Sequence, residues 1–351
     1  MSSRQGVGPE GLWYSGSAAA RFARAALAPA AAAYGAVVSL RGFLYDRGLL
    51  QVSRAPAPVV SVGALRVGGA GKTPFVLWLA TRLVARGLRP CIVTRGYGGR
   101  GDGAAPRLVT RDLAADPQVV NQAGDEACLL ALRSGLPVAV GRDRLAACRL
   151  ALRDAGSIDL FLLDDGFQHR RLARDLDVVL VSGSESREAL LPAGPLREGP
   201  GALRRAGIVV RTGAGGLPSA AVLGARTKPE MLVSSVGDEH GEDPSRLAGR
   251  RVVAVAAIAR PGRFLADLEA CGADVVASVL RRDHHLFDAD DRREIDEAAA
   301  QADLVVTTEK DLVKLAGSRP HPRWRALRIA VEVDDEERLL GLVDACAAFD
   351  R

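Results

Sequence analysis

Short apolar runs alternate along the chain with longer stretches in which apolar residues recur at helical spacing. The first run, Pro58–Val62, leads into a glycine-rich segment. In the stretch that follows, Pro74–Arg86, the apolar residues Phe75, Leu79 and Leu83 fall on one helical face. This order predicts a strand, a loop and a helix.

The same alternation continues to the C-terminal part of the chain. PCIVTRGYG is predicted as a strand and a loop, PVAVGRDRLAACRLAL as a strand and a helix, and IDLFLLDD as a strand that is apolar on both faces, as in parallel sheets. Further on, the predicted strands are RRVVAVAAI, DVVASVL and ADLVVTTEKD, with helices at PGRFLADLEACG and ADDRREIDEAAAQ. The pattern predicts an α/β fold with a doubly wound parallel sheet.

Three parts are expected along the chain. Charge and glycine density rise between Arg226 and Arg250 without a long apolar period, which indicates a linker or ribbon. We therefore expect an N-terminal segment over residues 1–50, a core domain over 51–225, and the linker ribbon with a smaller α/β domain over 226–351.

The N-terminal segment contains an uncharged run, Ala25–Leu40, with arginines on both sides. A helix that spans a membrane needs about 20 apolar residues. This run has 16, many of them alanine, and it includes Pro29. The pattern favours a helix that lies at a membrane surface, with a secretory signal or a buried core helix as the alternatives.

The formal net charge of +5 in 351 residues favours an anionic partner such as phosphate, nucleic acid or a membrane surface. Aromatic residues make up only 4% and are not interleaved with basic ones, so no nucleic-acid partner is expected. The five cysteines form no C-x-x-C pair, which favours reduced thiols in a cytosolic protein without a zinc site.

The glycine-rich segment after the first predicted strand has the composition of a P-loop. In such a loop, backbone N–H groups and a helix N-terminus surround a phosphate, a lysine neutralises charge, and a Ser/Thr hydroxyl binds Mg²⁺. Arg66 stands where the general pattern has its first glycine. The expected ATP-binding residues are Arg66, Val67, Gly68, Gly69, Ala70, Gly71, Lys72 and Thr73.

A P-loop also needs an acidic residue at the end of a neighbouring strand to hold or orient Mg²⁺. IDLFLLDD supplies Asp164 and Asp165 in that position, at the edge where α/β sheets bind their ligands. A solvated turn is the alternative.

Other candidate groups lie farther along the chain. Asp125 and Glu126 open a predicted helix, where they could serve only as caps. His284 and His285 are two of only five histidines, and an imidazole near a carboxylate is a natural proton relay. Arginines in short loops, which could hold an anionic acceptor or form ordinary surface ion pairs, are Arg95, Arg142, Arg144 and Arg197.

Together these motifs resemble the tetraacyldisaccharide 4'-kinase family of lipid A biosynthesis, which also replaces the first P-loop glycine. The resemblance extends from about residue 10 to about residue 315, in the order PVVSVGALRVGGAGKTP, TRGYGGR, GDEACLLA, LLDDGFQHRRL, LLPAGPLRE, DHH and TTEKDLVKL. Two positions depart from the family pattern: GDEA stands for GDEP, and Arg282 stands where a proline commonly precedes the DH pair.

The resemblance implies a P-loop NTPase-like core and ATP-dependent phosphorylation of the 4'-hydroxyl of tetraacyldisaccharide 1-phosphate, which gives lipid IVA. It implies a protein at the cytoplasmic face of the inner membrane, anchored by its N-terminal helix, and no obligate protein partner is inferred. The implied roles are Asp125 as general base paired with His284 from the second domain, Lys72 as the phosphate bridge, Thr73 with Asp164 (and Asp165 or Gln168) as Mg²⁺ ligands, and Arg95, Arg144, Arg197 and Glu198 at the acceptor. The alternative is a membrane-associated P-loop ATPase switch that acts on a protein partner.

Overall fold

The computed structural model describes residues 9–99, 105–212, 222–315 and 322–348. The chain divides into two compact units, each assembled from separate stretches of sequence. One, here called the P-loop unit, consists of Val7–Arg95, Asp143–Arg226 and Glu332–Arg351. The other, here called the Asp125 unit, is formed mainly by Gly96–Arg142 and Thr227–Val331. The stretch 96–142, which precedes half of the P-loop unit in sequence, thus packs with residues from the C-terminal half.

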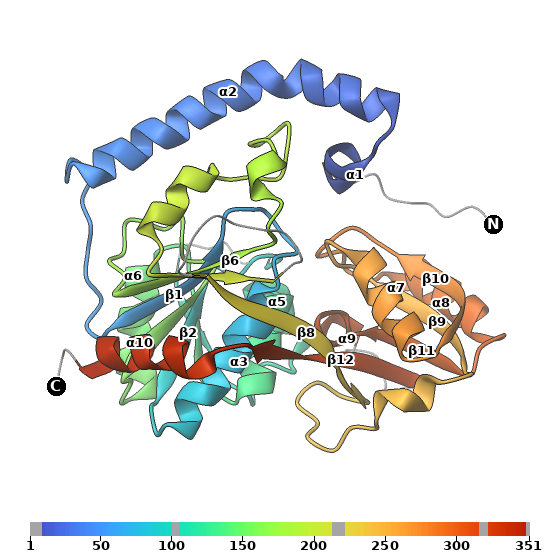
Figure 1. The fold of residues 1–351 in the computed structure, drawn as a ribbon. Coiled ribbons are helices and arrows are strands. Elements are labelled where there is room, and N and C mark those ends of the chain that lie inside the picture. The colour runs from blue at the N-terminus through green and yellow to red at the C-terminus, as the bar shows by residue number, and fades with distance from the viewer. Residues whose placement is uncertain (1–8, 100–104, 213–221, 316–321, 349–351) are drawn as a thin grey trace. The chain divides into compact units, whose positions relative to one another are not determined.

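The P-loop unit is built on a parallel sheet with the strand order β8-β7-β6-β1-β5-β2. Every residue of β1, β2, β5 and β6 is buried, as expected for parallel strands covered on both faces. Helices α3, α6 and α10 pack on this sheet (Figure 1). The bounds are β1 Val59–Ala64, β2 Pro90–Thr94, β5 Leu160–Asp164, β6 Leu176–Val181, β7 Ile208–Arg211, β8 Val222–Val233, α3 Lys72–Ala85, α6 Arg144–Ala155 and α10 Glu336–Ala348.

The Asp125 unit contains a second parallel sheet, β10-β9-β11-β12, and an antiparallel pair, β3 with β4. Alternate residues of β9 face opposite sides of the sheet: Val253 and Val255 pack in the core beneath α8, while Val252 and Ala254 pack with α7. The bounds are β3 Arg107–Val109, β4 Val138–Val140, β9 Arg251–Ala256, β10 Asp274–Leu280, β11 Leu304–Thr308, β12 Trp324–Val333, α4 Pro117–Ala123, α5 Asp125–Ser134, α7 Pro261–Ala270, α8 Ala289–Ala299 and α9 Glu309–Leu315. The α/β class predicted from the sequence is confirmed.

Two segments differ in detail from the sequence pattern. The predicted strand ADLVVTTEKD ends at Thr308, and a helix, α9, begins at Glu309. The hydroxyl of Thr308 accepts a hydrogen bond from the Asp311 N–H (3.1 Å), which closes the first turn of that helix. The charged stretch expected as a linker or ribbon begins within β8 and includes a short 3-10 helix at Pro244–Leu247.

The N-terminal part forms a short helix, α1 (Pro9–Tyr14), and a long helix, α2 (Ala18–Asp46). Ser17 caps α2 by accepting a hydrogen bond from the Ala20 N–H (3.2 Å). The helix extends beyond the uncharged run in both directions and contains Pro29. By length and composition α2 is able to cross a membrane, and only 6% of its most apolar stretch of 18 residues is buried. The helix is longer than the uncharged run, so its length fits both a spanning and an interfacial position, and the expected position at a membrane surface stays a prediction.

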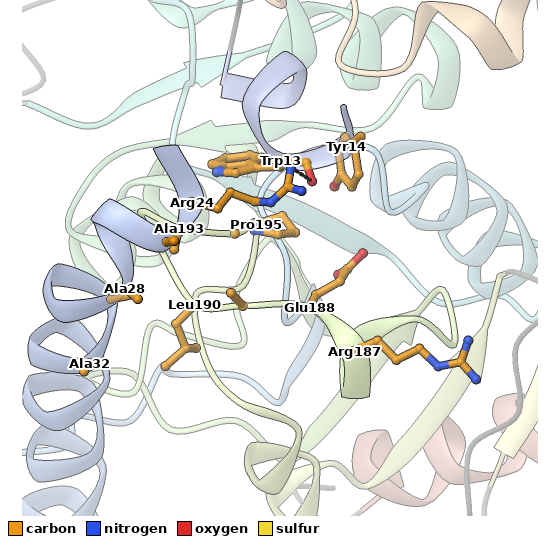
Figure 2. A pocket seen from close by; sticks show the side chains of 14 residues that line it. Trp13, Tyr14, Arg24, Ala28, Ala32, Arg187, Glu188, Leu190, Ala193 and Pro195 are labelled. Atoms are coloured by element: carbon orange, nitrogen blue, oxygen red, sulfur yellow. Dashed lines mark hydrogen bonds between the residues drawn. The ribbon is translucent and has the colours of Figure 1, made fainter. Parts of the chain in front are cut away.

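The two N-terminal helices pack against the loop that precedes Arg197. The indole N–H of Trp13 donates to the Pro192 carbonyl (3.0 Å), and the Tyr34 hydroxyl donates to the carbonyl of Arg197 (3.1 Å). Between the helices and this loop lies a cavity of about 660 Å³, lined largely by alanines of α2, by Leu190 and by Trp13 (Figure 2). The helix is thus attached to the same loop that carries candidate acceptor residues.

Candidate active site

The phosphate loop lies between β1 and α3. Gly68, Gly69 and Gly71 have positive φ angles of 63°, 62° and 78°, a backbone conformation that favours glycine. Lys72 and Thr73 are the first two residues of α3, where free N–H groups and the helix dipole attract anions. The local geometry is that of a phosphate-binding loop, as the sequence predicts.

The two acidic residues leave β5 at the edge of the sheet from which the phosphate loop leaves β1. Asp164 lies opposite Val62 in the parallel register of β5 and β1. Asp165, which adopts a positive φ of 58°, contacts Lys72 Nζ through Oδ1 (3.4 Å) and Arg197 through Oδ2 (2.7 Å). Burial raises the pKa of Asp165, but Lys72 and Arg197 outweigh it and hold the pKa below its ordinary value.

Asp164 and Gln168 make the other contacts in this region. Asp164 is buried and accepts a hydrogen bond from the Thr94 hydroxyl (3.4 Å). The Gln168 amide donates to the Ala64 carbonyl (3.0 Å) and accepts from Arg197 (3.4 Å). These contacts place Asp164, Asp165 and Gln168 beside the end of β1, where the phosphate loop begins.

A close approach of backbone segments fixes the acidic loop on β1. A Cβ atom on Gly63 would lie 2.4 Å from Cβ of Phe167 and 2.9 Å from its nitrogen, distances too short for any side chain at this position. Glycine at position 63 therefore lets the segment after Asp165 pack directly on β1.

Arg66 is anchored away from solvent. Its side chain is 1% exposed, lies 3.2 Å from the Glu188 carboxylate, and donates to the hydroxyls of Ser182 (2.9 Å) and Tyr14. Both terminal nitrogens of the guanidinium are therefore held by side chains of the P-loop unit. The side chain connects the start of the phosphate loop to α1 and to the segment after β6.

The predicted acceptor residues differ in their surroundings. Arg197 is held by Asp165, and Glu198 accepts a hydrogen bond from Arg205 (2.7 Å). Arg144 is buried as the first residue of α6, whereas Arg95 is exposed just beyond β2. Arg197 thus contacts the acidic pair directly, through Asp165.

In the Asp125 unit, Asp125 is the first residue of α5 and is 4% exposed. Gly124 before it has a φ of 93°, and a Cβ there would lie 2.2 Å from the Tyr97 carbonyl. Oδ1 of Asp125 accepts from the Glu126 N–H (2.9 Å) and lies 3.0 Å from Nδ1 of His284. The structure therefore brings together two residues that are far apart in sequence and places both in one unit.

In this pair, each side chain stabilises the charged form of the other. Burial raises the pKa of Asp125, but the hydrogen bond from His284, with Lys310 and Lys314, brings it below its ordinary value. Burial lowers the pKa of His284, but Asp125 outweighs it and raises the pKa. His284 also has a positive φ of 60°, a conformation that is uncommon outside glycine. An ionised carboxylate beside a readily protonated imidazole follows from this arrangement.

The neighbouring histidine has a different role. Nε2 of His285 lies 2.5 Å from Oδ2 of Asp291, in the first turn of α8. His285 therefore stabilises the start of α8, and of these two histidines it is His284 that contacts Asp125.

Sequence reasoning missed the lysines of α9. Lys310 Nζ lies 2.7 Å from Asp283, 3.2 Å from Glu126 and 3.4 Å from Nε2 of His284. Lys314 contacts Asp125 and Asp311. The available signal was their spacing of four residues within TTEKDLVKL, in a chain with only four lysines.

The protein has a glycine-rich phosphate loop whose lysine contacts an acidic residue, and it has a buried carboxylate–imidazole pair. These features are typical of a P-loop phosphotransferase. The family model LpxK, tetraacyldisaccharide-1-P 4'-kinase, matches residues 23–347, so the chain belongs to this family of lipid kinases.

Individual relatives agree with the family match. The chain is 43% identical over 334 residues to a tetraacyldisaccharide 4'-kinase of Anaeromyxobacter dehalogenans (strain 2CP-C), covering 90% of this chain and 87% of the relative. It is 42% identical over 306 residues to the protein of the same name from Azoarcus sp. (strain BH72), covering 85% of each. The crystal structure of LpxK from Aquifex aeolicus in complex with ATP has a TM-score of 0.77 and 31% identity, covering 92% of this chain and 99% of that one.

Proposed function

We propose that this protein transfers the γ-phosphoryl group of ATP to the 4'-hydroxyl of tetraacyldisaccharide 1-phosphate, and that Asp125 accepts the hydroxyl proton. The 43% identity to a tetraacyldisaccharide 4'-kinase supports the reaction. The buried contact between Asp125 and His284 supports transfer to a hydroxyl acceptor over a simple ATPase switch, because a switch has no need of a base for a small acceptor.

The P-loop unit binds the nucleotide in this proposal. Backbone N–H groups of Gly68–Thr73 surround the phosphates, and Lys72 exchanges its 3.4 Å contact with Asp165 for phosphate oxygens. Arg197 remains paired with Asp165, which lowers the free-energy cost of leaving that buried carboxylate without Lys72.

The oxygen donors near the phosphate loop fit Mg²⁺. Mg²⁺ prefers oxygen ligands and is usually held through one or two carboxylates together with substrate phosphates. Among the described residues no group of three or more His, Cys, Asp or Glu side chains could hold a metal by itself, which agrees with that mode. We assign Thr73 and Asp164, with Asp165 or Gln168, as the residues that would hold Mg²⁺, which neutralises phosphate charge when bound.

The Asp125 unit supplies the base. As O4' of the acceptor bonds to the γ-phosphorus, the bond from that phosphorus to the β–γ bridging oxygen breaks and ADP leaves. The O4' proton passes to the carboxylate of Asp125. His284 orients this carboxylate through Oδ1 and stabilises its ionised form. The proposed nucleotide residues and the proposed base belong to different units.

Acceptor and membrane binding complete the proposal. Arg95, Arg144 and Arg197 are the arginines assigned to the anionic acceptor, and Glu198 organises this region. The long apolar helix α2 is assigned to the cytoplasmic face of the inner membrane, and its attachment to the loop before Arg197 would keep that loop near the lipid.

The test is transfer of label from γ-labelled ATP to lipid A disaccharide 1-phosphate by the purified protein in detergent. Label on the lipid is expected. ATP turnover that is equal with and without the lipid would contradict the kinase assignment and favour a switch. Separately, deletion of residues up to Arg47 should release the protein from sedimented membranes, and continued sedimentation would reveal a second contact surface.

A further inference from the structure

Lys314 lies at the centre of a buried ionic group in the Asp125 unit. Its side chain is 1% exposed, and Nζ is 2.6 Å from Oδ1 of Asp311 and 3.6 Å from Oδ2 of Asp125. Nζ also lies 5.4 Å from the ring centroid of Phe287, within the range of a cation–π contact. One ammonium group therefore contacts the predicted base and the loop that carries His284.

Asp311 fixes this lysine to the framework of the unit. It is completely buried, and its Oδ2 accepts hydrogen bonds from the Ala257 N–H (2.9 Å) and the Thr308 hydroxyl (2.8 Å). These partners follow β9 and end β11, two central strands of the sheet. Because Asp311 is held from two strands, the position of Lys314 is set by the sheet.

The two oxygens of Asp125 have different partners. Oδ1 is held by the Glu126 N–H and by His284. Oδ2 is buried and has no hydrogen-bond partner among the described residues, and the ammonium group of Lys314 lies 3.6 Å from it. Oδ1 is thus the oxygen held by N–H donors, and Oδ2 is the one that faces the buried ammonium group.

We propose that Lys314 is a positioning residue for phosphoryl transfer, which holds the Asp125 carboxylate ionised and oriented for the acceptor hydroxyl. This inference rests on the proposed role of Asp125 as base. It assigns a function to the second lysine of TTEKDLVKL that is separate from Lys310, which pairs with Glu126 and Asp283.

The charged groups around Asp125 support the assignment. The charged groups that face Asp125 are His284 from the loop after β10, Lys310, Asp311 and Lys314 from α9, and Glu126 from its own helix, with the Cys128 thiol nearby. The hydrogen bond from His284 and the two cations on α9 together keep the buried carboxylate ionised against its desolvation. Removing the ammonium group closest to Oδ2 should therefore raise the pKa of Asp125.

The test compares Lys314→Met with Lys228→Met, which removes an exposed lysine of the same unit. An opposite charge within roughly 4–6 Å commonly shifts a pKa by about 1–3 units. We expect the acid limb of kcat/KM in Lys314→Met to move to higher pH by about one unit, which is about a tenfold loss on that limb. ATP affinity should stay unchanged, because the phosphate loop belongs to the other unit. Lys228→Met should keep the wild-type profile.

A double variant separates positioning from folding. Lys314→Met leaves Asp311 buried without its cation, so the unit could lose stability. Lys314→Met/Asp311→Asn removes that unpaired charge while the Asn oxygen still accepts from Ala257 and Thr308. Calorimetry should show a folded double variant, and its acid limb should remain displaced; a wild-type limb in either folded variant would overturn the inference.

A second readout does not depend on activity. The pKa of the Asp125 carboxyl, followed by NMR titration, should rise in Lys314→Met because the ammonium group 3.6 Å from Oδ2 is removed. An unchanged Asp125 titration in a folded variant would also count against the inference. If Asp125→Ala retains full transfer, the proposed base is wrong; if Asp125→Ala is inactive while the Lys314 variants match wild type, only the role of Lys314 is wrong.

Discussion

Each unit contains a lysine paired with an aspartate, and the two pairs differ in length and exposure. Lys72 and Asp165 lie 3.4 Å apart with side chains 12% and 10% exposed, whereas Lys314 and Asp311 lie 2.6 Å apart and are 1% and 0% exposed. The longer, more exposed pair suits the proposed role of Lys72, which is to exchange a carboxylate for incoming phosphates. The sealed pair suits a fixed charge, because separating buried ions costs several kcal/mol.

The largest expected effect comes from removing the carboxylate of Asp125, the proposed base. Asp125→Asn keeps the shape of the side chain but not its charge, and kcat for lipid phosphorylation should fall by roughly 10²–10⁴-fold. ATP affinity, measured by calorimetry, should not change. Asp116→Asn, at the exposed N-cap of α4 in the same unit, is the matched control, and comparable losses in both variants would contradict a base role for Asp125.

Removing Lys72 tests the open pair. Lys72→Met should lower kcat by roughly 10²–10³-fold, because a charge that stabilises the transferring phosphoryl group is lost, and it should weaken ATP binding. The melting temperature should change little, since Arg197 still pairs with Asp165. Arg82→Met, which alters an exposed pair on the same helix, should leave both kinetic constants near wild type. Full activity in Lys72→Met would remove this lysine from phosphate chemistry.

A packing variant should affect stability more than chemistry. Gly63→Ala forces a Cβ into Phe167, and overpacking of this kind costs about 1–3 kcal/mol. Urea unfolding should show this loss, while Gly341→Ala in α10, where a Cβ meets nothing within 4 Å, should be neutral or slightly stabilising. Equal stability of the two variants would mean that β1 and the acidic loop can separate without cost.

The comparison also shows what the sequence could predict. The phosphate loop, β1, β5 and the acidic pair follow from local patterns: an apolar strand, glycines with positive φ and a helix start are all encoded within a few residues. The α/β class follows from the repetition of such patterns. These features need no knowledge of distant contacts.

The buried ionic group around Lys314 could not be predicted from local sequence patterns. Asp125, His284 and Lys314 come from three separate stretches, and their contacts depend on the packing of 96–142 with 227–331. The strand pattern of ADLVVTTEKD concealed the start of α9, since Thr and Val favour strands while the Thr308–Asp311 contact decides the helix start. Likewise, the local sequence around Arg66 does not reveal that its guanidinium is buried against Ser182 and Glu188.

The smallest expected effect is a pH-dependent change in stability caused by the Asp125–His284 pair. The folded pKa of Asp125 lies below its ordinary 3.8, and that of His284 lies above its ordinary 6.5. The Asp125 contribution is therefore present above pH 3.8 and lost as pH falls through its folded pKa. The His284 contribution is present below pH 6.5 and lost as pH rises through its folded pKa.

Between these limits both groups are charged, so the pair contributes most to folding there. The difference in unfolding free energy between wild type and Asp125→Asn should be largest from about pH 4 to 6.5 and should shrink at higher pH as His284 loses its proton. Denaturant unfolding at a series of pH values measures this difference, and comparison with the variant cancels the other titrating groups. A difference that stays constant from acidic to alkaline pH would show that His284 is not protonated in the folded unit, and the carboxylate would then depend on the α9 lysines for its charge balance.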